Sequence, residues 1–403
     1  MNGDINRKLL YFYSIEIENY YIFEWMIKRV LLKKLEDLLY KGKALLLFGA
    51  RQVGKTTVLE QLVKSRKESV LLINGDEPDI REIFQSITST QLKNYLGQTK
   101  LLIIDEAQRI ENIGLTLKLI TDQLKDIQVI ATGSSTFEMI NKMNEPLTGR
   151  KFEFTMYPLS FAELVNHHGL LEEKRHLEQR MIFGSYPEIV QSNLSKEKLL
   201  SLIADSYLYK DLLMLETVKR PKLLEKLLKA LALQVGSEVS FNEIGQLVGA
   251  DKGTVEKYIQ LFEQTFIVFQ IPSYSKNIRN ELRKSKKIYF YDNGIRNAVI
   301  GNFNDISKRS DTGQLWENYL IAERIKHNAY AEHRVSTFFW RTTQQQEIDL
   351  IEEDNNQLTA FEFKWNKKAK AKISKTFTNA YPNSKTQLVT PANYEEFLIS
   401  KDH

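Results

Sequence analysis

The residues best suited to chemistry form the segment G-A-R-Q-V-G-K-T at positions 49–56. Gly49 and Gly54 allow the backbone to curl so that successive N–H groups point inward at phosphate oxygens. We expect Lys55 to neutralise charge between the β- and γ-phosphates of a nucleoside triphosphate, and the Thr56 hydroxyl to ligate Mg²⁺. Because the segment matches the full G-x-x-x-x-G-K-[ST] pattern, it predicts a phosphate-binding loop for ATP.

The segments on either side of this loop have the required character. Residues 44–48 form a continuous apolar run, which is typical of a central parallel strand buried on both faces. Residues 57–64 have a helical pattern, and a helix here presents its positive N-terminal end to the same anion. The predicted nucleotide-binding residues are Gly49, Ala50, Arg51, Gln52, Val53, Gly54, Lys55, Thr56 and Thr57.

A second apolar strand is predicted over residues 101–104, and it ends in the acidic pair Asp105-Glu106. We expect Asp105 to hold Mg²⁺ together with Thr56, usually through water, and Glu106 to polarise the attacking water. A positioned base favours ATP hydrolysis, whereas a nucleotide switch could work by ATP binding alone.

Two more residues are candidates for this site. A third strand over residues 129–131 ends in Thr-Gly-Ser-Ser, and its carboxyl end would lie beside the γ-phosphate. Ser134 is a candidate for sensing that phosphate or aligning water, whereas Ser135 serves equally well as a helix N-cap. Arg150 is either a charge-stabilising arginine, contributed within the subunit or from a neighbour, or an ordinary surface residue. The predicted catalytic residues are Glu106, Lys55, Arg150 and Ser134.

Length and composition limit the possible classes of protein. A chain of 403 residues is too long for one core, so we expect two or three domains. Cysteine is absent, which excludes disulfides and thiolate metal sites and fits a reducing cytoplasm. The six histidines show no metal-binding spacing, and no apolar run reaches the ~18 residues of a membrane helix. Residues 1–25 differ in composition from the rest, and we predict that Met26 is the natural start.

The middle of the chain predicts helices followed by a winged helix-turn-helix. Amphipathic helices are expected within residues 161–235, for example 196–213 and 221–233. Over residues 240–263, Ser240 is a good N-cap and a turn at 249–251 separates two helices. A strand over residues 266–271 would form the wing. The core-facing side chains are predicted to be Ile244, Leu247, Val248, Val255, Tyr258, Ile259 and Phe262.

DNA contact through this region stays open. Lys252, Thr254 and Lys257 are available early in the second helix, but Asp251 and Glu256 lie among them. Winged helices also serve as interaction modules or lids inside ATPases. A set of basic residues beyond the wing is either a source of phosphate contacts or a solvated loop: Arg279, Arg283, Lys284, Lys286 and Lys287.

The last hundred residues predict a helix, a three-strand meander, a Lys-rich helix, a strand and a short helix. The first helix spans residues 312–327, and the four strands span 336–341, 347–351, 359–365 and 387–390. This order is that of the core of restriction-endonuclease-like nucleases. The Lys-rich stretch is either a surface for a nucleic-acid backbone or a solvated helix face, and it contains Lys367, Lys368, Lys370, Lys372 and Lys375.

Four side chains of this region fall in nuclease-like positions. Strand alternation puts Glu362 and Lys364 on one face, about 7 Å apart. Asp349 stands on the preceding strand, and Glu317 is an additional acidic residue from the helix. In the nuclease interpretation, Asp349 and Glu362 bind Mg²⁺ and Lys364 positions water. The alternative is an exposed pair of Glu362 with Lys364 that has no catalytic role.

The order of motifs along the chain resembles that of a known family. I-K-R-V-L, G-A-R-Q-V-G-K-T, I-I-D-E-A-Q, A-T-G-S-S, L-T-G-R and Y-P-L-S-F-A-E-L are followed by G-S-Y-P-E, Y-F-Y-D-N-G and G-Q-L-W-E-N-Y-L. Over nearly all of residues 26–365 the chain resembles the AAA-type ATPases of bacteria and archaea that carry a C-terminal domain of unknown function. Ser185 departs from the pattern, since the family usually has a second glycine there.

Together these patterns predict an α/β protein. We expect an N-terminal extension (1–25), a P-loop parallel-sheet ATPase domain (26–160), a helical region (161–235), a winged helix (236–300) and a restriction-endonuclease-like domain (301–403). The predicted function is ATP hydrolysis coupled to a C-terminal half that binds or cuts DNA or RNA. The alternative is a nucleotide-dependent switch that binds a partner without cleavage. A magnesium nuclease gated by ATP is a third reading, and assembly into a homo-oligomer stays open.

Overall fold

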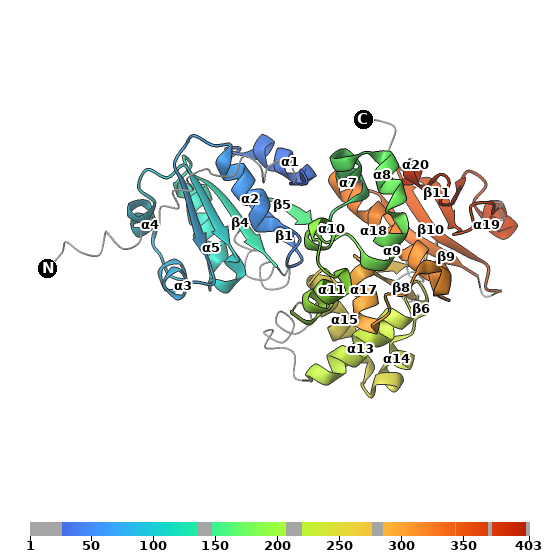
Figure 1. Cartoon of the computed structure of the whole chain (residues 1–403). Helices are drawn as coiled ribbons and strands as arrows, with labels where there is room; N and C mark the ends of the chain where they lie inside the picture. The colour runs from blue at the N-terminus through green and yellow to red at the C-terminus, as the bar shows by residue number, and fades with distance from the viewer. Residues whose placement is uncertain are drawn as a thin grey trace.

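The structure is a computed structural model that describes residues 26–134, 147–206, 220–275, 285–342, 344–369 and 373–399. The predicted extension 1–25 and Ser135 lie outside these ranges. Below, the N-terminal domain means residues 26–160, the middle region 161–300 and the C-terminal domain 301–399. Figure 1 shows the N-terminal domain in blue and teal on one side and the C-terminal sheet in orange and red on the other.

The N-terminal domain is built on a five-stranded parallel sheet with strand order β2-β3-β4-β1-β5. The strands are β1 (Ala44–Gly49), β2 (Val70–Asn74), β3 (Leu101–Asp105), β4 (Gln128–Gly133) and β5 (Lys151–Met156). The residues of β1, β3 and β4 are all buried, as their continuous apolar runs predict. The helices are α1 (Val30–Leu38), α2 (Lys55–Lys64), α3 (Pro78–Phe84), α4 (Ser89–Leu96) and α5 (Ile113–Gln123).

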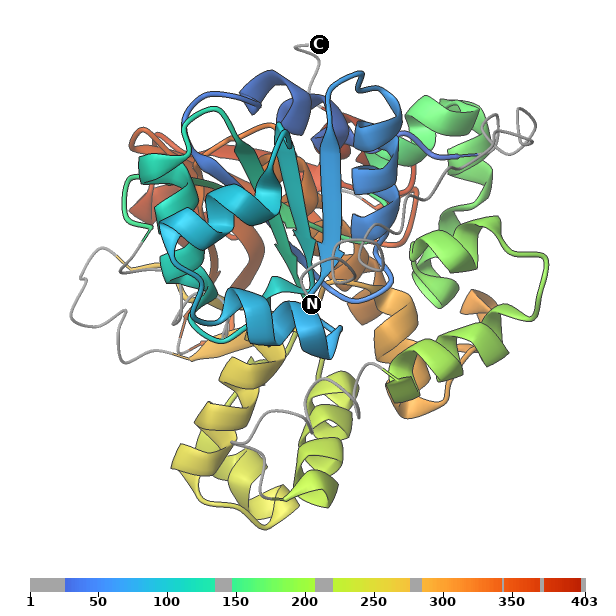
Figure 2. The same cartoon turned by 90° about the vertical axis from the view of Figure 1, so that its left-hand side faces the viewer.

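The middle region contains short helices, a helix pair and a small antiparallel sheet. Its first helices are α7 (Phe161–His168), α8 (Leu170–Arg175), α9 (Leu177–Phe183), α10 (Pro187–Gln191), α11 (Lys196–Ser206) and α13 (Pro221–Leu233). They are followed by α14 (Phe241–Val248), α15 (Lys252–Gln264) and α17 (Asn293–Ile300), while β6 (Glu238–Val239), β8 (Lys286–Phe290) and β7 (Val268–Pro272) form the sheet in that order. Figure 2 shows α13, α14 and α15 projecting below the N-terminal sheet.

Two helices joined by a turn lie where the helix-turn-helix was predicted, with one wrong core residue. The Ser240 side chain caps α14, Gly249 takes a left-handed conformation, and the Asp251 side chain caps α15. Of the predicted core residues Ile244 is buried, but Leu247 is 67% exposed. The reason is that α14 ends at Val248 and the chain reverses at Gly249, so its last turn reaches the end of the helix pair.

The C-terminal domain has a four-stranded mixed sheet with strand order β12-β11-β10-β9. Its elements are α18 (Thr312–Tyr330), β9 (Ser336–Arg341), β10 (Glu347–Asp354), β11 (Gln357–Phe363), α19 (Lys375–Ala380), β12 (Lys385–Val389) and α20 (Tyr394–Leu398). The order of elements follows the prediction. The Lys-rich segment, however, is a turn at Lys367 and Lys368, and helix begins only at Lys375; Lys370 and Lys372 lie outside the described residues.

Helix α18 connects the three parts of the molecule. The Glu323 carboxylate accepts from Phe161 N at 2.7 Å, and Lys326 Nζ donates to Leu159 O at 3.3 Å. On another side the Asn318 amide exchanges hydrogen bonds with the backbone of Phe290 in β8. Most residues of α18 are buried, which is typical of a central core element. Across the described residues, no helix combines the length and apolar character needed to span a bilayer.

Candidate active site

The loop between β1 and α2 has the predicted curled form. Gly54 has φ +94°, a conformation that a side chain disfavours. At Gly49 an added Cβ would collide with the Met156 backbone oxygen on β5, so close approach of two strands requires glycine. The Lys55 ammonium donates to the carbonyls of Gly49 and Ala50, each at 2.8 Å, and is therefore held inside the loop.

Thr56 and Asp105 meet at the carboxyl edge of the sheet. The Thr56 hydroxyl lies 2.9 Å from Asp105 Oδ2, and the Thr132 hydroxyl donates to Asp105 Oδ1. A hydroxyl and a carboxylate fit Mg²⁺, which takes few protein oxygens and keeps water and phosphate ligands. Among the described residues there is no group of three or more His, Cys, Asp or Glu side chains that could hold a metal by themselves. Thr132 was not predicted, although it lies in the quoted A-T-G-S-S motif.

The Glu106 carboxylate is held by two neighbours. Gln108 Nε2 donates to Glu106 Oε2 at 2.5 Å and to Ser134 Oγ at 3.1 Å, while Ser134 Oγ donates to Glu106 Oε2 at 3.3 Å. Ser134 therefore lies next to Glu106. A side chain that aligns the attacking water has to lie in this position. Gln108 was missed by the sequence reasoning. Its signal is the spacing in D-E-A-Q, which places it in the turn that follows Glu106.

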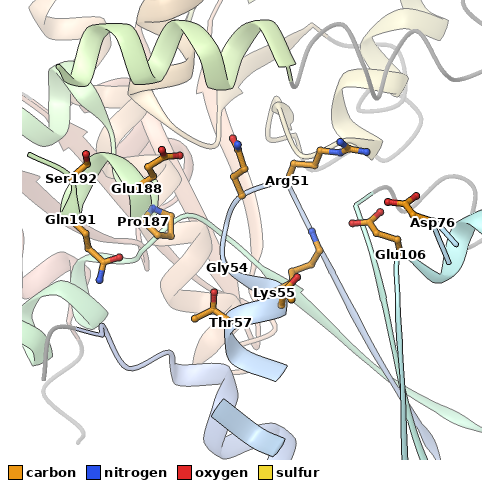
Figure 3. A pocket seen from close by; sticks show the side chains of 12 residues that line it. Arg51, Gly54, Lys55, Thr57, Asp76, Glu106, Pro187, Glu188, Gln191 and Ser192 are labelled. Atoms are coloured by element: carbon orange, nitrogen blue, oxygen red, sulfur yellow. The ribbon is translucent and has the colours of Figure 1, made fainter. Parts of the chain in front are cut away.

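A cavity of about 800 Å³ opens over this loop, and its walls come from two parts of the chain (Figure 3). One wall consists of loop and strand-end residues: Arg51, Gln52, Gly54, Lys55, Thr56, Thr57, Asp76 and Glu106. The other wall belongs to the middle region and consists of Pro187, Glu188, Gln191 and Ser192. These four and Asp76 were not predicted as site residues. The G-S-Y-P-E motif was noticed, but its spatial partner cannot be read from sequence.

The second wall is fixed by a buried carboxylate. Gly184 has φ +69°, and an added Cβ would collide with the carboxylate of Asp292 at the start of α17. The same carboxylate accepts from Ser185 N at 2.7 Å. Because Ile189 is buried as well, α10 is held firmly where it faces the loop.

Arg150 lies at the wrong edge of the sheet for a role within its own subunit. It precedes Lys151, which pairs with Ala44 at the beginning of β1, whereas the nucleotide loop follows the end of β1. Its side chain forms an ion pair with Asp122 at 2.6 Å. The in-subunit role is therefore wrong, and a role toward a neighbouring subunit stays a prediction.

The four predicted nuclease-like residues form one polar cluster. Lys364 Nζ lies 3.0 Å from Glu362 Oε2 and 4.0 Å from Asp349 Oδ2. Glu317 accepts from the Tyr289 hydroxyl at 2.6 Å and from Lys287 Nζ at 3.1 Å. Lys287 lies in β8 of the middle region, and it also pairs with Glu347. It therefore links Glu317 on α18 to Glu347 on β10.

Lys287 was predicted as a basic loop residue that could contact phosphate, and this is wrong. Its side chain is only 2% exposed, because it lies in β8 and faces Glu317 and Glu347. Arg279, Arg283 and Lys284 lie outside the described residues. The carboxylates of the cluster thus have an internal cation.

Burial shifts the titration of the cluster. Burial raises the pKa of Glu317 to about 7, with Lys287 opposing the shift and Asp349 adding to it. Burial also raises the pKa of Glu362 to about 7, with Asp349 adding and Lys364 opposing. Burial raises the pKa of Asp349 too, against the attraction of Lys364 and Lys287. At pH values between their ordinary and their raised pKa values, these carboxyls hold protons that they would lose in an unfolded chain.

This shift predicts a pH dependence of stability. Glu362 has an ordinary pKa of 4.5 and a folded pKa of about 7, so the folded state binds more protons between these values. The free energy of unfolding should therefore fall as pH rises through this window. Glu362→Gln stays neutral, so its thermal midpoint should fall less than that of the wild type. Glu396→Gln, an exposed residue of α20, is the control, and a wild-type slope in Glu362→Gln would contradict the assignment.

Comparisons with known proteins agree with this geometry in the N-terminal domain. Residues 41–165 match a family model described as an AAA domain, and residues 174–306 and 312–401 match two models described as domains of unknown function, DUF8612 and DUF4143. An uncharacterized protein of Haemophilus influenzae is 26% identical over 305 residues, covering 69% of this chain and 73% of that protein. An uncharacterized protein of Mycobacterium tuberculosis is 24% identical over 343 residues, covering 82% and 72%.

Among solved structures, a Walker-type ATPase of Pyrococcus abyssi is 16% identical with a TM-score of 0.47, covering 68% of this chain and 96% of that one. The comparisons support neither a winged-helix nor a nuclease identity for the rest of the chain. The AAA match and the parallel sheet together support a P-loop ATPase domain that binds and hydrolyses ATP.

Proposed function

We propose that this chain is a Mg²⁺-dependent ATPase whose nucleotide lies between the N-terminal domain and the middle region, so that its ATP cycle acts on the C-terminal domain. The observation that carries the proposal is the cavity with one wall from the phosphate-binding loop and the other from α10. A ligand that touches both walls favours their approach, and its loss removes that bias.

The roles of the site residues follow from their contacts. The backbone N–H groups of residues 49–57 cradle the phosphates, and Lys55 offsets charge between the β- and γ-phosphates. Thr56 and Asp105 are the protein oxygens that would hold Mg²⁺, which supplies charge neutralisation on the phosphates. Glu106 orients and deprotonates the attacking water, while Gln108 and Ser134 fix its carboxylate.

A buried arginine supports transmission from the loop to the C-terminal domain. Arg29 donates to the carbonyl of Val53 in the loop at 2.5 Å and to Tyr157 O at 2.6 Å. It also reaches the Tyr330 hydroxyl at the end of α18 at 3.4 Å, and the same hydroxyl accepts from Tyr157 N at 3.2 Å. A movement of the loop on ATP binding therefore alters the hydrogen bonds that Arg29 makes with the end of α18.

Two substitutions in the nucleotide site separate ATP binding from ATP turnover. Lys55→Ala should lose ATP binding, because the cation that faces the β- and γ-phosphates is removed. Glu106→Gln should bind Mg-ATP but hydrolyse it at least ~100-fold more slowly, the scale for losing a positioned base. Calorimetry and a phosphate-release assay measure the two quantities. Turnover at the wild-type rate in Glu106→Gln would disprove the assignment of Glu106 as the base.

A further prediction concerns coupling between the nucleotide site and α18. In the Glu106→Gln protein, Mg-ATP should slow amide hydrogen exchange both in Pro187–Gln191 and at the end of α18 near Tyr330. Adding Tyr330→Phe should preserve the first effect and reduce the second, because the hydroxyl between Arg29 and Tyr157 is lost. Tyr319→Phe is the matched control, since it removes a hydroxyl from the same buried helix. If ATP leaves exchange in α18 unchanged in every variant, the coupling is disproved.

A nuclease gated by ATP is the second candidate function. The contact of Lys364 with both Glu362 and Asp349 favours it. The buried ammonium of Lys287 pairs instead with the neighbouring carboxylates of Glu317 and Glu347, and this internal pairing favours binding without cleavage. The exposed Lys367 and Lys368, beside the end of β11, suit a nucleic-acid backbone.

One set of incubations tests both readings of the C-terminal domain. Single-stranded DNA, duplex DNA and RNA are added with Mg²⁺ or Mn²⁺, and cutting and ATP turnover are followed together. Cutting that Asp349→Ala and Lys364→Ala abolish, with ATPase activity intact, would establish the nuclease. Stimulated turnover without cutting is the result expected for a nucleic-acid-binding ATPase, and no effect on either would favour a protein partner.

A further inference from the structure

The position of the phosphate-binding residues fixes the direction of a nucleotide in the cavity. Lys55 serves the β- and γ-phosphates, and the terminal phosphate must lie near Glu106, which acts on the attacking water. The nucleoside then extends away from Glu106, past Thr57. Figure 3 shows Glu106 and Asp76 on one side of the loop and α10 on the other. The wall formed by α10 therefore faces the nucleoside.

Glu188 is the charged side chain of that wall. It is exposed to the cavity, and its carboxylate forms no hydrogen bond or ion pair with any residue in the described part of the chain. A carboxylate only accepts hydrogen bonds, so a ligand that approaches it must donate. Phosphate oxygens would be repelled, whereas sugar hydroxyls are donors and can give two hydrogen bonds to one carboxylate.

The backbone that carries Glu188 is rigid enough for recognition. It follows Pro187 at the start of α10, next to the buried Tyr186 and before the buried Ile189. Pro187 lies against the loop, since a Cβ built on Gly54 would be 4.0 Å from its Cγ. The carboxylate is thus presented beside the loop by residues that are themselves fixed, which lowers the entropy lost on binding.

We infer that Glu188 recognises the sugar hydroxyls of the nucleotide and makes the site selective for ribonucleoside over 2′-deoxyribonucleoside triphosphates. This inference rests on the proposed function, because it requires a nucleotide in the cavity. It adds a specificity-determining residue from outside the phosphate-binding domain. Recognition of the sugar by the middle region also gives ATP a direct contact with both walls.

Binding measured by calorimetry tests the inference in the Glu106→Gln background, where turnover does not interfere. The ligands are Mg-ATP, Mg-2′-deoxyATP and Mg-tripolyphosphate. The parent protein should bind ATP about 10-fold or more tightly than 2′-deoxyATP, the scale of a hydrogen bond to a charged group. Glu188→Ala should lose that preference through weaker ATP binding, with affinities for 2′-deoxyATP changed less and for tripolyphosphate unchanged.

Glu178→Ala is the control, because Glu178 is exposed on α9 and does not line the cavity. It should keep the preference of the parent protein. The inference is overturned if the parent shows no preference, if Glu188→Ala retains it, or if Glu188→Ala weakens tripolyphosphate as much as ATP. Failure of a folded parent protein to bind any Mg-nucleotide would instead overturn the proposed function.

Discussion

The buried guanidinium of Arg29 joins parts of the molecule that are distant in sequence. It forms an ion pair with Glu163 at 2.9 Å and donates to the backbone of Val53 and Tyr157. Burial disfavours its charge, but the attraction of Glu163 and Tyr330 outweighs this and raises the pKa of Arg29. Loss of either charged partner would leave the other buried and unpaired, which is costly. The nucleotide loop, α7 and α18 are therefore held in one arrangement.

This arrangement matters because a parallel sheet provides only part of a nucleotide site. The carboxyl ends of β1, β3 and β4 supply the phosphate loop, the Asp105-Glu106 pair and Thr132. The opposite wall has to come from another element, and here it is α10. Its position depends on Asp292, a residue more than a hundred positions away that accepts hydrogen bonds at Ser185. The nucleotide cavity is thus a property of the whole assembly of domains.

The two polar centres of the chain differ in how their charges are satisfied. At the nucleotide site, the Lys55 ammonium is held by the backbone carbonyls of Gly49 and Ala50 inside the phosphate-binding loop. In the C-terminal cluster, Lys287 and Lys364 pair directly with the carboxylates. The first arrangement is suited to an anionic ligand. The second is largely self-neutralised, which is why the same residue types do not carry the same functional conclusion.

The sequence by itself determined the local features of this protein. The apolar run 44–48, the glycines at 49 and 54 and the capping residues Ser240 and Asp251 act over a few positions, so strand, loop and helix starts could be predicted. The strand alternation that puts Glu362 beside Lys364 is equally local. The order of elements in the C-terminal domain followed for the same reason.

Only the tertiary structure decided which distant residues meet. It placed Arg150 at the end of the sheet where β1 begins, opposite the nucleotide loop. It also buried Lys287 among carboxylates and brought Glu188 to the nucleotide loop. None of these results is encoded by spacing along the chain, because each depends on how separate elements pack. Contacts between residues far apart in sequence are fixed by the balance of burial, charge pairing and close approach across the complete fold, which no short pattern contains.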